Sequence, residues 1–189
     1  MTINDLQYSV KRSKRRTLAI RCGFDGSLTV LAPFIASRSD IEKAIEGNLW
    51  WITKKSEERK KLFENKDTTP IDAAETVALM KKAKERLPER FDSWANVLDV
   101  SYNKLSVKLM LSRWGSCSSA RNISVNCLLM LAPEYVIDYI IVHELAHIKH
   151  MDHSKDFYIF VDKHFHLRKK AQLWLKNDGV LIINRARSE

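Results

Sequence analysis

The chain has 189 residues, of which 45% are hydrophobic and 29% are charged, with only 5 glycines and 4 prolines. This composition excludes fibrous and disordered proteins and allows one sizeable core, in one or at most two domains. The net charge of +9 favours polyanionic partners, so weak binding of nucleic acid or nucleotides is one expectation. Lysine-rich surfaces that are exposed to solvent explain this excess of positive charge equally well.

Three widely spaced cysteines, an odd number, argue against a disulfide framework and for a reducing compartment. No apolar run approaches the length of a membrane-spanning helix, and the first residues lack the pattern of a signal peptide. We therefore expect a cytoplasmic protein that makes no contact with a membrane.

The first third of the chain predicts a small antiparallel β-meander followed by a helix. Residues 18–22 and 28–31 are short apolar runs on either side of a turn, and residues 8–11 can add a strand before them. A capping box at Ser39 and Glu42 predicts that the helix begins near Ser39. An apolar stripe at helical spacing continues this helix into a charged end near residue 61.

A polar segment at residues 66–70 indicates a linker. We therefore predict a β-meander plus helix over residues 1–66 and a second region over residues 67–189, although the two can also form one unit. The second region begins with a helical pattern over residues 71–98, which Pro88 should kink or divide. The fold class predicted from these elements is α+β.

Two strands and three helices are expected in the rest of the chain. Residues 105–111 and 123–128 read as neighbouring strands. Pro133 suits the first position of a helix that should run to about residue 149. Two further helical patterns follow at residues 155–163 and 168–176.

The strongest chemical signal is HELAH at residues 143–147, which has the H-E-x-x-H form. On a helix, His143 and His147 lie four positions apart on one face, so both imidazoles can reach one ion. Glu144 can then act as the general base for a water that the metal activates. This pattern predicts a hydrolase with one zinc ion, because a chance match accompanied by two further nearby histidines is improbable.

A catalytic zinc takes three protein ligands and one water, so a third ligand is needed. A downstream glutamate is excluded, since the next one after Glu144 is Glu189. His150 lies two helical turns from His143, but three ligands in a nearly straight row cannot converge on a tetrahedral ion. The candidates that remain are His153, His164, His166, Asp152, Asp156 and Asp162.

A bend after about residue 149 brings His153 back to the ion, with Asp152 or Ser154 capping the next helix. We therefore predict His153 as the third ligand. His150 is left as a residue beside the site that can face the substrate, or as a plain surface histidine at a helix end.

These motifs together resemble the YgjP-like metallopeptidase family, which is related to the SprT-like and Wss-type minimal zinc proteases. The resemblance rests on the histidine motif, on RWGSC at residues 113–117, on NCLLMLAP at residues 126–133, and on the N-terminal segment at residues 12–21. It implies zinc held by His143, His147 and His153, with Glu144 as base. It also implies a minimal zincin-like region whose active-site helix lies beside the edge of a β-sheet.

The RWGSC segment supplies further candidates near the substrate. Gly115 permits close approach of the backbone, and the segment can form an edge strand that pairs with an extended peptide. Arg113 can stabilise an oxyanion, although a surface arginine is an equal alternative. Ser116 and Cys117 are expected near the cleft, and Cys117 is a candidate soft ligand if it comes close to the ion.

Three functions remain open from the sequence. The first is a zinc-dependent metallopeptidase that acts on a peptide or protein. The second is a metal-dependent nucleotide hydrolase, such as a nucleoside triphosphate pyrophosphatase, which the resemblance admits. The third is a basic nucleic-acid-binding module with structural zinc. Lys11 to Arg16 place basic residues on one strand face, but no aromatic residues are interleaved for base stacking.

Overall fold

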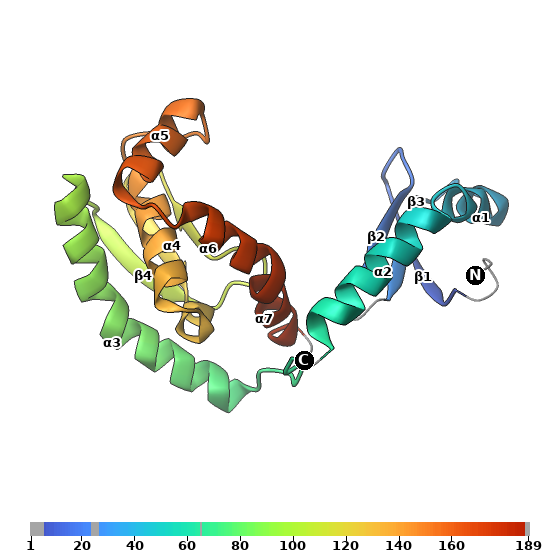
Figure 1. Cartoon of the computed structure of the whole chain (residues 1–189), viewed down its shortest axis with the longest axis horizontal. Coiled ribbons are helices and arrows are strands. Elements are labelled where there is room, and N and C mark those ends of the chain that lie inside the picture. Colours follow the sequence, from blue (N-terminus) through green and yellow to red (C-terminus); the bar gives the residue numbers. More distant parts are fainter. Residues whose placement is uncertain (1–5, 24–26, 65, 188–189) are drawn as a thin grey trace. The chain divides into compact units, whose positions relative to one another are not determined.

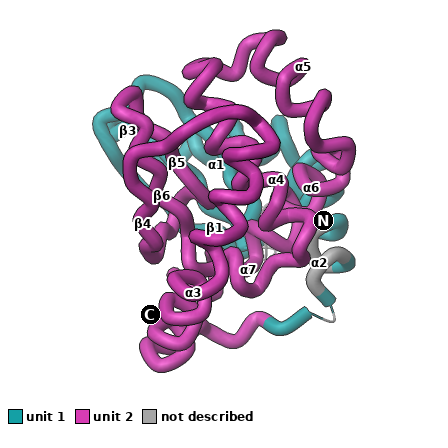
Figure 2. The backbone as a smooth tube through the Cα atoms, turned by 90° about the vertical axis from the view of Figure 1, so that its left-hand side faces the viewer, with its two compact units in different colours: residues 1–67 teal, residues 68–189 magenta. Residues whose placement is uncertain are grey.

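The computed structural model describes residues 6–23, 27–64 and 66–187 (Figure 1). The chain divides into two compact units, residues 1–67 and residues 68–189 (Figure 2). Each unit has its own hydrophobic core. No helix among the described residues is both long enough and apolar enough to span a membrane.

The first unit contains a three-stranded mixed sheet. Its strands are β1 (Tyr8–Ser13), β2 (Ala19–Cys22) and β3 (Leu28–Pro33). Their order is β1-β3-β2, with β1 parallel and β2 antiparallel to β3. The predicted antiparallel meander is therefore wrong in its pairing. Leu28, Val30 and Ala32 make β3 the most buried strand, and the central position in the sheet lets β3 pair its backbone on both sides.

Two helices, α1 (Arg38–Glu46) and α2 (Leu49–Phe63), stand where the sequence predicted one. The capping box is also displaced by two residues from the prediction. The Ser37 hydroxyl accepts a hydrogen bond from the Asp40 N–H, and the Asp40 carboxylate accepts one from the Ser37 N–H at 2.8 Å. Asp40 thus takes the role expected of Glu42, because Ser37 is the last residue with extended backbone before the helix.

The second unit contains a separate three-stranded sheet. Its strands are β4 (Lys104–Lys108), β5 (Gly115–Cys117) and β6 (Asn122–Asn126). Their order is β4-β6-β5, with β4 parallel and β5 antiparallel to β6. The two predicted strands therefore do lie side by side, and β5 at the edge of the sheet lies within the RWGSC segment, where the sequence allowed an edge strand.

Helices surround this sheet. They are α3 (Ala73–Leu98), the 3-10 helix η2 (Cys127–Leu131), α4 (Glu134–Ala146), α5 (Lys155–His164), α6 (Arg168–Trp174), the π-helical turn η3 (Leu175–Gly179) and α7 (Val180–Arg185). Helix α4 contacts α3, α5, α6, η2 and β5, so it runs through the core. The helices and small mixed sheets confirm the α+β fold class.

Helix α3 is not divided at Pro88, where the sequence predicted a kink or a division. Pro88 is exposed, and its neighbour Leu87 belongs to the buried stripe of the helix. That stripe recurs every three or four residues and packs against η2 and α4. Burial along the whole stripe offsets the hydrogen bond that the proline cannot make.

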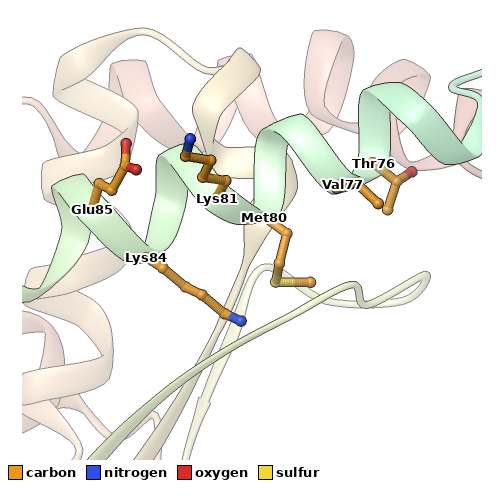
Figure 3. Close-up of a pocket in the computed structure, with 6 residues that line it drawn as sticks. All are labelled: Thr76, Val77, Met80, Lys81, Lys84 and Glu85. Atoms are coloured by element: carbon orange, nitrogen blue, oxygen red, sulfur yellow. The ribbon is translucent and has the colours of Figure 1, made fainter.

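A surface hollow of about 440 Å³ lies along α3 (Figure 3). It is lined by Thr76, Val77, Met80, Lys81, Lys84 and Glu85. Met80 and Lys84 point to one side of the helix in this view, and Lys81 and Glu85 point to the other. None of these residues belongs to the histidine motif, so the hollow is separate from the predicted site.

Candidate metal centre

Helix α4 carries the first part of the predicted metal centre on its last turn. Nine of its thirteen residues are buried, including Glu144, so apolar contacts hold the helix in the core. His143 lies in this last turn and His147 caps the carboxyl end. Their rings are 4.9 Å apart, because residues four positions apart share one face of a helix.

The chain reverses after α4, and this reversal brings in His153. The Nζ of Lys149 donates a hydrogen bond to the Leu98 carbonyl at 3.0 Å, which ties the turn to the end of α3. Ser154 then begins α5, its hydroxyl accepting from the Phe157 N–H. This is the bend that the sequence required, with Ser154 as the cap.

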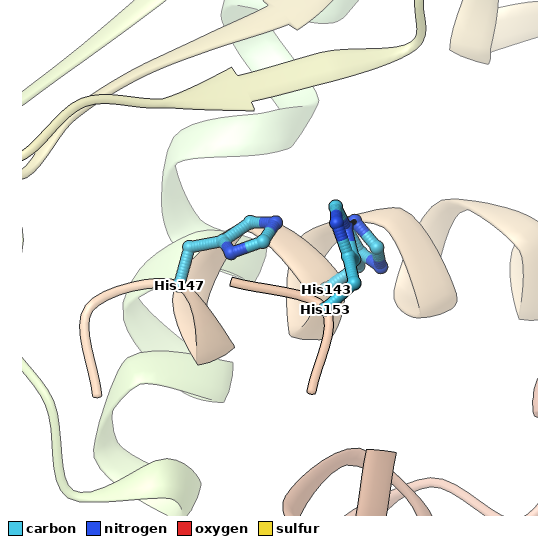
Figure 4. Close-up of side chains that lie close together, drawn as sticks. All are labelled: His143, His147 and His153. Atoms are coloured by element: carbon cyan, nitrogen blue, oxygen red, sulfur yellow. Dashed lines mark hydrogen bonds between the residues drawn. The ribbon is translucent and has the colours of Figure 1, made fainter. Parts of the chain in front are cut away.

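Three histidines converge as a result (Figure 4). Ligand nitrogens of His143, His147 and His153 all lie within 4.8 Å of one another. The Nε2 atoms of His143 and His153 are 3.1 Å apart. Nitrogens bound to one tetrahedral zinc at about 2.0–2.1 Å stand about 3.3 Å from each other, so this spacing suits the ion.

The contacts of the rings leave Nε2 free to face the ion. The Nδ1 of His147 is 3.1 Å from the carbonyl oxygen of His150, which is an acceptor, so this nitrogen is the protonated one. Burial, with the charges of His147 and His153, lowers the pKa of His143 to about 3. A neutral imidazole is the form that binds a metal, so the environment of His143 favours ligation.

Phe157 forms an apolar wall behind the three imidazoles. Its fully buried ring lies 5.0, 4.7 and 5.0 Å from the rings of His143, His147 and His153. In the sequence, Phe157 is marked by nothing more than its place as the first large apolar residue after the Ser154 cap.

Glu144 is buried between the two histidines of α4, with 4% of its surface exposed. Its Oε2 has no hydrogen-bond partner among the described residues. Burial raises the pKa of this carboxyl to about 8, although the charge of Arg113 acts in the opposite direction. A buried carboxylate oxygen without a partner costs free energy, so it fits a site completed by a bound group.

Strand β5 lies against Glu144. A Cβ placed on Gly115 would stand 2.4 Å from the Oε1 of Glu144, which is too close for any other residue without displacement. Ser116 and Cys117 are partly buried on the same strand. The predicted candidates Gly115, Ser116 and Cys117 therefore do lie on a strand at the edge of a sheet beside the helix.

Cys117 and Arg113 lie near Glu144 but outside the histidine cluster. Burial and the charge of Glu144 raise the pKa of the Cys117 thiol, which disfavours the thiolate that binds metals. Arg113 is exposed, and its carbonyl accepts a hydrogen bond from the Nδ2 of Asn126 at 2.9 Å.

Asn126 is a buried residue whose role was not predicted from the sequence. Its Nδ2 also donates to the Met110 carbonyl at 2.6 Å, and its Oδ1 accepts from the Leu128 N–H at 3.2 Å. This side chain therefore fastens the segment before β5 to the end of β6. The indication in the sequence is an asparagine at the end of an apolar strand, because a buried amide group needs hydrogen-bond partners.

His150 contributes its backbone to the site. Its imidazole lies against the ring of Phe160, with 5.6 Å between the centroids, and it is not part of the three-histidine cluster. The carbonyl oxygen of His150 contacts the Nδ1 of His147. This arrangement is consistent with the expectation, based on helix geometry, that His150 is not a ligand.

Comparison with known proteins gives one family match. Residues 74–178 match the YgjP-like, metallopeptidase domain family. Comparisons with curated proteins and with solved structures each gave no match. The matched residues include the three-histidine cluster, Glu144 and β5, and they make up more than half of the chain. The chain therefore belongs to the YgjP-like metallopeptidase family.

Proposed function

We propose that the protein is a zinc-dependent peptidase in which His143, His147 and His153 hold the ion and Glu144 is the general base. The observation that carries the proposal is the pairing of the three-histidine cluster with the unpartnered Oε2 of Glu144. When bound, zinc polarises a carbonyl and makes a water molecule more acidic.

Each residue of the proposed site has a separate role. The positive charge of a bound zinc would favour the ionised form of Glu144. In that form Glu144 takes a proton from the attacking water at a carboxylate oxygen and passes it to the amine that leaves, so the carboxylate is regenerated. His147 needs no proton exchange, because its Nδ1 is directed to the His150 carbonyl. Phe157 excludes water from the side of the histidines opposite the substrate, since its ring is buried against them.

Strand β5 supplies a place for an extended peptide. Within the described sheet it pairs with β6 on one side only, so its other edge can add a substrate strand. Gly115 keeps this edge close to Glu144, which brings the substrate backbone to the base. Arg113 and His150 remain candidates for contact with the substrate or with the oxyanion.

The first experiment separates metal binding from the chemical step. Glu144→Gln should retain zinc and lose hydrolysis of a casein-like peptide, whereas His147→Ala should lose the metal. His150→Ala is the matched control for metal binding alone, because it removes an imidazole near the cluster and keeps the carbonyl that His147 contacts. Full peptidase activity in Glu144→Gln would contradict the mechanism.

The second experiment tests the two alternative functions. Purified protein is assayed on a peptide and on a nucleoside triphosphate, each with and without a chelator. Chelator-sensitive release of pyrophosphate without peptide cleavage would favour the nucleotide hydrolase. Inactivity on both substrates, with nucleic-acid binding that depends on bound zinc, would favour the non-enzymatic module.

A further inference from the structure

A chain of side-chain contacts connects the surface of the second unit to His143. At its outer end, Arg168 at the start of α6 donates to both carboxylate oxygens of Asp162 on α5, at 2.5 and 2.7 Å. Two parallel hydrogen bonds of this kind fix the plane of the guanidinium. The group also lies over the ring of Tyr158, at 4.9 Å, so its position is set from two sides.

The next contact in the chain has a definite direction. The Nη1 of Arg168 is 3.3 Å from the Oε1 of Gln172. A guanidinium can only donate, so it selects the amide orientation in which the Gln172 oxygen faces it. The Nε2 of Gln172 consequently points the other way and donates to the hydroxyl oxygen of Tyr139 at 3.0 Å.

Tyr139 completes the chain at the first histidine of the cluster. It lies one turn before His143 on α4, is 3% exposed, and its hydroxyl oxygen is 3.5 Å from the Nδ1 of His143. That separation is long for a hydrogen bond, so the contact orients the ring more than it adds strength. The rings of the two residues also meet edge to face, with 5.7 Å between their centroids.

Zinc ligation by one ring nitrogen of a histidine sets a requirement for the other ring nitrogen. If His143 binds zinc through Nε2, the proton of the neutral ring is on Nδ1 and needs an acceptor. The carbonyl of His150 fills this role for His147. For His143, the hydroxyl oxygen of Tyr139 is the polar atom that the structure places beside Nδ1.

We propose that Tyr139 is a positioning residue for His143, and that Gln172, held by Arg168, fixes the Tyr139 hydroxyl for this purpose. This inference rests on the proposed zinc site. It links zinc affinity to the corner between α5 and α6, which contains no ligand. A partner that orients a ligating histidine is commonly worth about 10–100-fold in metal affinity, and the 3.5 Å contact indicates the lower end, about tenfold.

The test is the zinc dissociation constant, measured by competition with a chelator for folded variants of the full chain. Tyr139→Phe removes one oxygen and should raise this constant about tenfold. Tyr135→Phe is the matched control, because Tyr135 lies one turn earlier on α4 and its ring contacts Lys170 instead. This control should bind zinc as the wild type does.

Two substitutions at Gln172 distinguish positioning from packing. Gln172→Leu keeps most of the volume and removes the donor to Tyr139, so zinc affinity should fall. Gln172→Glu can still pair with Arg168 and can accept the proton of the Tyr139 hydroxyl, so zinc affinity should stay near that of the wild type. A role in packing alone would not separate these two variants.

Nuclear magnetic resonance of zinc-loaded protein labelled with ¹⁵N-histidine gives an independent reading. The Nδ1–H proton of His143 should be protected from exchange in the wild type and exposed to it in Tyr139→Phe. Unchanged zinc affinity and unchanged protection in Tyr139→Phe would overturn the proposal. A wild type that binds zinc but hydrolyses nothing refutes the proposed function alone, and one that binds no zinc refutes both.

Discussion

Gly115 on the edge strand β5 is packed directly against Glu144 on α4, and a Cβ at position 115 would stand 2.4 Å from the Oε1 of that carboxylate. Every real side chain at this position would displace either the strand or the carboxylate. The general base and the strand proposed to hold the substrate are therefore positioned by the same contact.

We expect Gly115→Ala to lower kcat for peptide cleavage by at least tenfold while the protein stays folded and keeps its zinc, because a misplaced catalytic group commonly costs ten- to a hundredfold. Gly47→Ala in the first unit is the control, since a Cβ there meets its nearest atom at an ordinary 3.4 Å. Steady-state kinetics measure the effect. Unchanged kcat in Gly115→Ala would show that the contact has no role in catalysis.

Phe157→Ala should lower the free energy of unfolding by about 3–5 kcal/mol, because it opens a cavity behind the three imidazoles. Urea denaturation of the zinc-free protein measures this loss. Phe34→Ala is the control, since Phe34 is 63% exposed and its truncation should have little effect. Phe157→Leu, which leaves a smaller void, should fall between the wild type and the alanine variant.

Asn126→Ala should lower the free energy of unfolding by about 1–3 kcal/mol, because the carbonyls of Met110 and Arg113 lose a buried donor. The loss should be accompanied by lower peptidase activity, since the segment before β5 is no longer fastened. Asn103→Ala, which removes one exposed hydrogen bond, serves as the control in the same denaturation and activity assays. Equal stabilities for the two variants would contradict this reading.

Glu134 at the start of α4 should make stability depend on pH in acid. The hydrogen bond from Arg90 lowers the pKa of Glu134 below its usual 4.5, and the contact with Arg86 acts in the same direction. The folded state therefore holds this proton less tightly than the unfolded state. The stabilisation is complete above pH 4.5 and is lost as the pH falls through the lower folded pKa.

The measurement is the urea midpoint of the wild type and of Glu134→Gln between pH 3 and pH 7. The wild type should be the more stable protein at neutral pH, and the difference should shrink in acid. A difference that grows as the pH falls would mean that the sign is wrong.

Zinc should raise the thermal midpoint of the wild type, because a ligand that binds only the folded state stabilises it. The shift should increase with zinc concentration and should be absent in His147→Ala. Calorimetry with and without a chelator measures it. An equal shift in the two proteins would place the metal elsewhere in the chain.

Much of the secondary structure was readable from local pattern. The apolar stripe of α3 and the short apolar runs of β2 and β3 are short-range signals, and these elements are where the sequence placed them. The predicted turn between β2 and β3 includes residues 24–26, which lie outside the described residues. One local prediction was wrong, since the capping box lies at Ser37 and Asp40, where the last residue with extended backbone precedes the helix. At Pro88 the helix is not divided, because burial of its apolar stripe continues on both sides of the proline.

The pairing of strands could not be read in the same way. Alternating apolar residues predict that a segment is a strand, but they carry no information on its neighbour. The most buried strand, β3, took the centre of the first sheet, so β1 pairs with it in parallel. The sequence allowed an edge strand at residues 113–117, but its partner was not predicted; the structure pairs β5 with β6.

By itself, the sequence determined which residues are candidates for the metal centre, because helical spacing and the inventory of histidines and carboxylates are local properties. His143 and His147 follow from these alone. His153 was one of six candidates and was chosen on an expected bend after about residue 149, in agreement with the family resemblance. The role of all three as zinc ligands stays a prediction. Only the tertiary structure placed Gly115 against Glu144, Phe157 behind the imidazoles, and Gln172 beside Tyr139. The contacts of Gly115 and Gln172 join segments far apart in the chain, and such contacts are decided by the burial of the whole core.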